Sequence, residues 1–167
     1  LKLLEFVLGS NTTTAELLKL RGQSMQKAVP VGEGGMAALL GADIKKASAL
    51  ANASSEGEVC TVANDNDPTQ VVISGHTGAI ERAIAAAKDH GIKRGILLPV
   101  SAPFHCSLME PAAEAMEEAL AEANLFSPIV PVFANVTAAP VSDADEIRDL
   151  LVRQVSGCRN RQPDFDG

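Results

Sequence analysis

His105 is the histidine whose place in the sequence best suits chemistry. It lies on the loop 101–106, directly after a predicted strand at 94–100, and loops held by a rigid scaffold often carry catalytic residues. A neutral imidazole there could accept a proton as a general base. A lone histidine is more often a surface residue or one satisfied by its neighbours. His76, at a turn, and His90, near a helix end, fit that structural role.

Arg21 is a cation at a position where burial is expected. It falls on a predicted helix whose apolar residues recur at helical spacing, between Leu20 and Gly22, and an unpaired charge is costly to bury. The guanidinium therefore needs an anion. A ligand carboxylate held through two parallel hydrogen bonds is one answer, and a structural salt bridge is the more common one.

Several other polar residues could contact a ligand, and each has a structural alternative. Side-chain amides could bond the amides of a ligand, although hairpin turns use Asn for backbone reasons alone. Two neighbouring cations could meet a phosphate, although a solvated pair is the default. These residues are Gln70, Asn64, Asn66, Lys93 and Arg94.

The composition is that of one soluble domain, and it excludes two classes of partner. The chain has 167 residues, 46% of them hydrophobic and 21% charged, within the usual globular range. A net charge of −7 and the lack of Trp and Tyr argue against binding nucleic acid. Charged residues interrupt every long apolar run, so no membrane span is expected. Lys2 and Glu5 lie within the first apolar run, which argues against a secretory signal.

The cysteines indicate the compartment and argue against a metal site. Cys60, Cys106 and Cys158 are odd in number, and none has the spacing of a zinc site. A reducing cytoplasm is the simplest interpretation, and no metal is expected.

The centre of the chain predicts one compact α/β unit. Its elements alternate in the order strand, helix, strand, strand, helix, strand, with Asp and Asn in the loop 64–69 and Thr77 as the cap of the second helix. This order is that of a ferredoxin-like split βαβ unit. The predicted elements are 36–40, 42–53, 58–63, 70–74, 77–90 and 94–100.

The flanking elements indicate a separate α/β body into which this unit is inserted. A helix at 14–27 with Thr14 as its cap precedes the unit, and a helix at 108–124 with five glutamates on its wet side follows it. A buried strand at 129–135 and an amphipathic helix at 143–155 complete the body. We assign 1–34 and 101–156 to this partial body, 35–100 to the small subdomain and 157–167 to an aperiodic tail.

Four motifs follow one another along the chain: R-G-Q-S-M-Q at 21–26, A-V-P at 28–30 with Gly32 and Met36, Q-V-V-I-S-G at 70–75, and S-A-P-F-H-C-S-L-M at 101–109. Together they resemble malonyl-CoA:acyl carrier protein transacylases of bacterial fatty acid synthesis. They occur in the family's order, and the match covers about 14–156. The resemblance implies an α/β-hydrolase-like acyltransferase body with a ferredoxin-like insertion.

The resemblance also implies roles for four residues. In this family a serine takes malonyl from coenzyme A and passes it to the thiol of acyl carrier protein, with the coenzyme A thioester as substrate and no bound cofactor. His105 would be the general base, and Arg21 would pair with the free carboxylate of malonate. Gln70 and Arg94 would line the side of the cleft that meets coenzyme A or the carrier protein.

The family's nucleophile motif, G-H-S-L-G-E, does not occur in this chain. L-G-S-N at 8–11 is no G-x-S-x-G turn, so Ser10 is not a substitute. The family places a residue that supports the histidine after 156, where residues 157–167 look unrelated. We therefore expect the isolated chain to lack transacylase activity. The alternatives are a non-catalytic module that binds carrier protein or acyl-CoA, and a truncated inactive fragment.

Overall fold

The computed structural model describes residues 11–161, so Ser10 and the end of the predicted tail lie outside the described residues. The first seven elements are α2 (Asn11–Ala28), β1 (Gly34–Leu40), α3 (Ile44–Ser55), β2 (Cys60–Asp67), β3 (Gln70–His76), α4 (Thr77–Ala86) and β4 (Arg94–Leu97). A short 3-10 helix, η1 (Ser107–Met109), then leads into α5 (Glu110–Ala121), β5 (Val132–Ala134), β6 (Ala139–Val141) and α6 (Ala144–Ser156).

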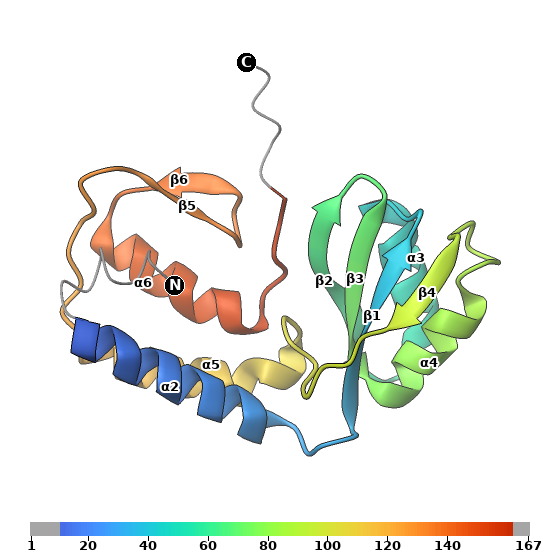
Figure 1. Cartoon of the computed structure of the whole chain (residues 1–167), viewed down its shortest axis with the longest axis horizontal. Coiled ribbons are helices and arrows are strands. Elements are labelled where there is room, and N and C mark those ends of the chain that lie inside the picture. Colours follow the sequence, from blue (N-terminus) through green and yellow to red (C-terminus); the bar gives the residue numbers. More distant parts are fainter. Residues whose placement is uncertain (1–10, 162–167) are drawn as a thin grey trace.

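The central strands form one antiparallel sheet in the order β2-β3-β1-β4. Helices α3 and α4 cover one of its faces (Figure 1). The predicted alternation of strands and helices is therefore present. The first hairpin is longer than predicted, because β2 continues through Asn64 to Asp67 and only Pro68 and Thr69 remain in the turn. β4 is shorter than predicted and ends at Leu97.

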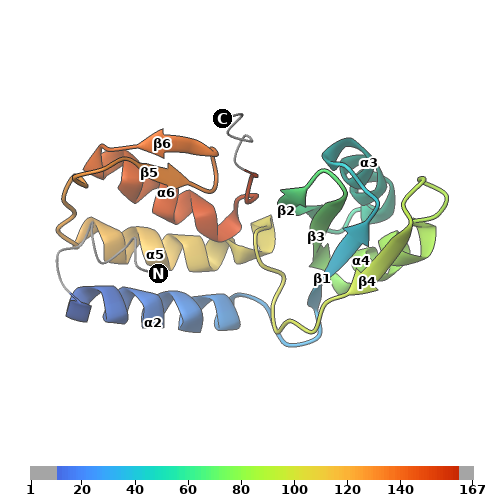
Figure 2. The ribbon, with the colours of Figure 1, turned by 45° about the horizontal axis from the view of Figure 1, so that its top comes forward.

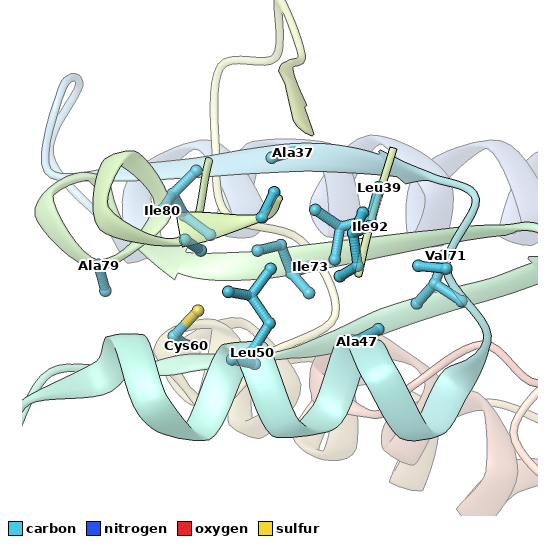
Figure 3. Close-up of a cluster of buried hydrophobic side chains, with 14 residues drawn as sticks. Ala37, Leu39, Ala47, Leu50, Cys60, Val71, Ile73, Ala79, Ile80 and Ile92 are labelled. Carbon is cyan, nitrogen blue, oxygen red and sulfur yellow. The ribbon is translucent and has the colours of Figure 1, made fainter. Parts of the chain in front are cut away.

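The core between this sheet and its two helices is built from small and branched side chains. Leu50 of α3 points at the sheet, where it meets Ile73 and Leu39 (Figure 3), and all three are fully buried. Each buried side chain of this kind contributes about 1.5–3 kcal/mol. Alanines on both helices are also buried and allow the helices to lie close to the sheet: Ala47, Ala51, Ala79 and Ala83.

The other face of the sheet packs against the segment that follows β4. Leu98 and Phe104 of this segment contact a cluster that includes Met36 and Val72, and the Leu98 amide donates to the Met36 carbonyl at 2.9 Å. A Cβ added to Gly34 would overlap the ring of Pro103. Because glycine lacks that atom, the proline ring lies directly on β1.

The rest of the chain forms a helical layer beside the sheet. Helix α5 lies between α2 and α6, and the β5-β6 hairpin lies over α6 (Figure 2). Leu17, Met109 and Leu120 are among the buried residues of this layer. Arg148 of α6 donates to the Leu120 carbonyl and, at 3.1 Å, to the Ala123 carbonyl. It therefore satisfies two carbonyl groups at the end of α5. The five glutamates of α5 and its C-cap are exposed, as predicted.

Two predicted helix caps are wrong. Thr14 lies inside α2, which already includes Asn11, and Thr14 is buried. Thr77 is the first residue of α4 and not its cap. Its hydroxyl donates to the Gly32 carbonyl at 2.8 Å and its amide donates to the Glu33 carbonyl at 3.0 Å. The turn before β1 thus accepts from both donors of the first residue of α4.

The predicted buried strand at 129–135 is wrong over its first half. Only Val132–Ala134 form a strand, and it pairs with β6. Ile129 and Val130 are 102% and 67% exposed. The apolar sequence of this segment predicts cover on both faces, and the described residues provide no cover for these two side chains.

The first residues of the predicted tail join the two parts of the molecule. Arg159 pairs with the outer edge of β2: its amide donates to the Ala63 carbonyl at 2.8 Å, and its carbonyl accepts from the Asp65 amide at 2.9 Å. The next residue, Asn160, donates from its amide to the Asn135 carbonyl at 2.7 Å. Residues 158–161 thus connect the sheet to the end of β5.

Gly34→Ala should destabilise the chain by about 1–3 kcal/mol, because its new Cβ would overlap Pro103 and the rigid ring must move. Gly22→Ala in α2 is the matched control. No atom lies within 4 Å of the added Cβ there, so this change should stabilise the helix by about 0.5–1 kcal/mol. Urea unfolding measures both. A Gly34→Ala variant as stable as the parent would contradict the packing of Pro103 on β1.

Candidate active site

His105 lies between the sheet and the helical layer, on the segment that joins β4 to η1. It is half-buried and adopts a left-handed backbone conformation, with φ of 61°. Its Nδ1 lies 3.0 Å from the carbonyl oxygen of Gln154. A carbonyl can only accept a hydrogen bond, so Nδ1 carries the proton and donates. In the neutral imidazole this leaves Nε2 as the nitrogen that can accept a proton.

The surroundings of His105 favour the neutral ring. Burial is the largest influence and lowers its pKa below the ordinary value of 6.5, and the positive charges of Arg21 and Arg159 lower it further. Hydrogen bonds to the backbone of Gln154 and, to a smaller extent, of Gly157 act in the opposite direction. The net lowering keeps the ring unprotonated at neutral pH. A half-buried neutral imidazole is suited to general-base chemistry.

Arg21 lies on the buried side of α2, one turn from Leu17 and one turn from Met25, both of which are buried. Its Nη2 donates to Oε1 of Gln154 at 2.6 Å. None of the ion pairs among residues 11–161 includes it. Burial lowers the pKa of the guanidinium, although arginine stays charged. This cation therefore has a neutral amide as its described partner, and its charge remains available to an anion.

Gln154 connects the two candidate residues and was missed by the sequence analysis. Its backbone carbonyl fixes His105, and its side chain holds Arg21. A signal was present: Gln154 continues the stripe of Ile147, Leu150 and Leu151 on α6, where an apolar residue is expected. A polar residue on the buried stripe of a helix indicates a specific partner.

No residue of 157–167 was assigned to the support of His105 in the sequence analysis. In the structure the ring bonds to the backbone of Gln154, inside α6, and the backbone of Gly157, directly after α6, also acts on it. The side chain of Asn160 donates to the Val136 carbonyl instead. The physical reason is that the chain leaves α6 at Gly157 and turns towards β2, so Asn160 bonds to the end of the hairpin.

The segment that carries His105 is fixed on both sides. Nε2 of Gln26, near the end of α2, donates to Oγ of Ser101 at 2.7 Å. Cys106 is buried and its thiol donates to the Pro103 carbonyl at 3.1 Å. Phe104 contacts both the helical core and the sheet cluster. The sheet, α2 and α6 therefore position His105 together.

Gln70 and Arg94 lie away from this centre. Both pair with Leu40, at the end of β1, whereas Pro103 packs on Gly34 at its start. A seven-residue strand spans roughly 20 Å, so the structure does not bring these two residues to His105. Asn64, from the predicted polar loop, lies opposite Arg159 at the edge of β2. His76 has a structural role, because its Nδ1 accepts from the Val59 amide at 2.9 Å.

Neither a metal-binding cluster nor a membrane-spanning helix is found in the described part of the chain. Within residues 11–161, no group of three or more His, Cys, Asp or Glu side chains could hold a metal ion. No helix in that range is long and apolar enough to cross a membrane.

The chain is similar to one family of acyltransferases. No model of a known protein family matches it. The malonyl CoA-acyl carrier protein transacylase of Salmonella typhimurium is 48% identical over 139 residues, which cover 83% of this chain and 45% of that protein. The Escherichia coli K12 protein of the same name is 47% identical with the same coverage.

Solved structures give the same result. An acyl-carrier-protein S-malonyltransferase from Bartonella henselae matches with a TM-score of 0.85 and 51% identity over 89% of this chain and 48% of that chain. A malonyl-transacylase in complex with a type II polyketide acyl-carrier protein matches with a TM-score of 0.84 and 39% identity, over 87% of this chain and 47% of that chain. The fold is mixed α/β, as predicted. The sequence resemblance is confirmed, and the chain spans less than half the length of the curated relatives it matches.

Removing the Arg21 charge should raise the pKa of His105, because that charge is one of the influences that lower it. An NMR titration of the imidazole compares Arg21→Met with the parent chain. Lys19→Met, on the exposed side of the same helix, is the control and should leave the pKa unchanged. An unchanged pKa in Arg21→Met would mean that the guanidinium does not face the ring.

The same lowering predicts how stability depends on pH. Because the folded pKa lies below the ordinary 6.5, the unfolded chain binds the proton more readily. The contribution of His105 to stability is therefore complete above pH 6.5 and is lost as the pH falls through the folded pKa. His105→Gln should weaken the loss of stability on acidification, and an identical pH profile would contradict the burial of the ring.

Proposed function

We propose that this chain, homologous over 139 residues to malonyl CoA-acyl carrier protein transacylases, supplies the base and the carboxylate receptor for transfer of a malonyl group from coenzyme A to acyl carrier protein. The observation that carries the proposal is the pair of hydrogen bonds that Gln154 makes to His105 and Arg21. A general base and a cation without a described counter-ion are held on one residue. Acyl transfer to and from a malonyl thioester needs both.

In the first half-reaction, a serine hydroxyl gives its proton to Nε2 of His105 as its oxygen bonds to the thioester carbonyl carbon. The bond from that carbon to the coenzyme A sulfur then breaks, and the imidazolium returns the proton to the leaving thiolate. In the second, Nε2 takes the proton of the carrier-protein thiol, whose sulfur displaces the serine oxygen, and the proton goes to that oxygen. These 167 residues contain no G-x-S-x-G turn that could supply this serine.

Arg21 selects the acyl group. Its charge has no ion-pair partner among the described residues, so a malonyl carboxylate would complete a charge-assisted pair there. An acetyl group lacks that carboxylate and would leave the buried guanidinium unmatched, which costs binding energy. The bond to Gln154 restrains the guanidinium before the substrate arrives, so less side-chain freedom is lost on binding.

The carrier protein would approach a locally positive site on a chain whose net charge is −7. The charges of Arg21 and Arg159 both act on His105, so the centre itself attracts anions. Gln70 and Arg94, at the far end of β1, would contact coenzyme A or the carrier protein away from the reacting atoms. The proposed partners are acyl carrier protein and malonyl-CoA, and they include neither nucleic acid nor a membrane.

The proposal includes the finer description of the fold. The antiparallel order β2-β3-β1-β4 with two helices on one face supports a ferredoxin-like subdomain over 35–100. Residues 1–34 and 101–156 would then be part of an α/β-hydrolase-like body, followed by the tail 157–167. The three free cysteines among the described residues support a reducing, cytoplasmic location.

A chimera tests the assigned roles. The matched stretch of the Salmonella transacylase is replaced with the corresponding residues of this chain, and transfer from malonyl-CoA to carrier protein is measured. His105→Ala should lower the rate by about 10²–10⁴-fold, and His90→Ala should leave it unchanged. A chimera that keeps full activity with His105→Ala would show that His105 is not the general base.

The same chimera tests Arg21 through selectivity. Arg21→Ala should lower the preference for malonyl-CoA over acetyl-CoA by about a hundredfold or more, because the carboxylate loses its charged partner. Lys19→Ala, on the exposed side of α2, should preserve the preference. Equal selectivity in Arg21→Ala and the parent would remove Arg21 from substrate binding.

The isolated 167-residue chain should form no malonyl adduct, because it has base and cation but no nucleophile turn. Intact-mass measurement after incubation with malonyl-CoA checks this. A stable adduct on a serine would overturn the expectation. No adduct together with saturable carrier-protein binding would favour a non-catalytic binding module.

A further inference from the structure

A polar cavity lies between the outer edge of β2 and the end of β5, where the residues after α6 pass from one to the other (Figure 1). Its volume is about 300 Å³. A water molecule occupies about 30 Å³ of the liquid, so the cavity has room for a small ion with part of its hydration shell. Every residue that lines it is polar: Asp65, Asn66, Asn135, Arg159, Asn160 and Arg161.

Hydrogen bonds of the backbone hold the walls of this cavity in place. The Arg159 carbonyl accepts from the Asp65 amide at 2.9 Å, and the Asn160 amide donates to the Asn135 carbonyl at 2.7 Å. Asn160 also donates from its side chain to the Val136 carbonyl. The lining side chains therefore extend from a connected framework, so little backbone freedom would be lost when a ligand binds.

Arg161 carries a buried hydrogen-bond donor that has no partner. Its Nη1 is one of two buried side-chain nitrogen or oxygen atoms within residues 11–161 that make no hydrogen bond, and the other is the hydroxyl of Ser74. A buried donor without a partner costs free energy, and the cost is larger for a charged group. Native proteins pair nearly all such groups. The Arg161 guanidinium is therefore suited to an oxygen atom of a ligand.

The cavity is locally positive, although the net charge of the chain is −7. Arg159 and Arg161 line it together with a single carboxylate, that of Asp65, and none of the ion pairs in the described range includes either arginine. Asp67 is near Arg161, but hydrogen bonds from Thr69 are the main causes that lower its pKa, and the Arg161 charge contributes least. Both guanidinium groups thus remain available to an anion.

Phosphate matches these side chains in both its charge and its proton. A guanidinium can donate two parallel hydrogen bonds to phosphate oxygens, and the side-chain amides of Asn66 and Asn135 are further donors. An ionised carboxylate only accepts hydrogen bonds, so Asp65 needs a ligand oxygen that carries a proton. Inorganic phosphate keeps a proton near neutral pH, whereas sulfate keeps none. We propose that the cavity binds inorganic phosphate, with Arg159 and Arg161 as donors and Asp65 as the acceptor of its proton.

This site does not rest on the proposed function. Both arginines lie after residue 156, where the resemblance to the transacylases ends, so the cavity is a feature of this chain and does not follow from its family. Titration calorimetry of the full 167-residue chain with inorganic phosphate tests it, at neutral pH and constant ionic strength. One phosphate should bind per chain with saturation. Sulfate should bind at least about tenfold more weakly, because it has no proton to donate to Asp65.

Arg161→Gln is the test variant, and Arg153→Gln, at an exposed residue of α6 outside the cavity, is the matched control. Arg161→Gln should weaken phosphate binding at least about tenfold, as expected for the loss of a hydrogen bond from a charged group. Arg153→Gln removes the same charge and should leave the affinity unchanged. Asp65→Asn should abolish the preference for phosphate over sulfate, because an amide can donate to an oxygen that carries no proton.

Unfolding of the same variants separates a ligand site from a structural role. Because Nη1 of Arg161 has no partner to lose, Arg161→Gln should not lower the unfolding midpoint of the phosphate-free chain. Saturating phosphate should raise the midpoint of the parent chain and leave that of Arg161→Gln unchanged. A midpoint that falls in Arg161→Gln without phosphate would indicate a structural arginine and would contradict the proposal.

Three binding results would overturn the proposal. The first is no saturable binding of phosphate by the parent chain, and the second is equal affinity in the parent chain and Arg161→Gln. The third is binding that Arg21→Met abolishes, because the anion would then lie at the candidate active site. Malonyl transfer is not measured in these experiments, so their failure is distinguishable from failure of the proposed function.

Discussion

Two hydrogen bonds to Gln154 hold the candidate site together. The backbone carbonyl of this residue accepts from Nδ1 of His105, and its side-chain oxygen accepts from Nη2 of Arg21. The first bond sets the tautomer of the imidazole, and the second restrains the guanidinium. Because both come from one residue near the end of α6, any movement of that helix changes the base and the cation together. The site is one rigid unit although its members lie far apart in sequence.

The charge of Arg21 explains why such rigidity is useful. A half-buried guanidinium loses hydration, and a neutral amide restores only part of it. The structure therefore retains an unsatisfied preference for a carboxylate, and it keeps the imidazole beside this cation neutral by the same burial and charge. The sheet contributes through Gly34, which lets Pro103 lie on β1 and so fixes the segment that carries His105. Stability and site geometry depend on the same contacts.

Much of this could be predicted from the sequence, and the failures have physical causes. The order of strands and helices follows from local periodicity, and His105 and Arg21 follow from a loop position and a charge on an apolar helix. The contact of Gln154 with His105 could not be predicted, because it uses a backbone carbonyl, which no residue type encodes. Its side-chain contact with Arg21 was indicated only by a polar residue on the apolar stripe of α6. Thr77 was misassigned because it is already the first residue of the helix and its hydroxyl donates to the Gly32 carbonyl of a distant turn. The segment at 129–131 was predicted to be buried from its apolar sequence alone, and the described residues do not cover Ile129 and Val130.

The central claim is that the Gln154 carbonyl holds His105 as the neutral tautomer with its proton on Nδ1. Long-range proton-nitrogen NMR of the imidazole side chains at neutral pH measures this directly, because protonated and unprotonated ring nitrogens have well-separated shifts. The account predicts a protonated Nδ1 and an unprotonated Nε2 for His105. A proton on Nε2, in either the other tautomer or the imidazolium, would contradict it.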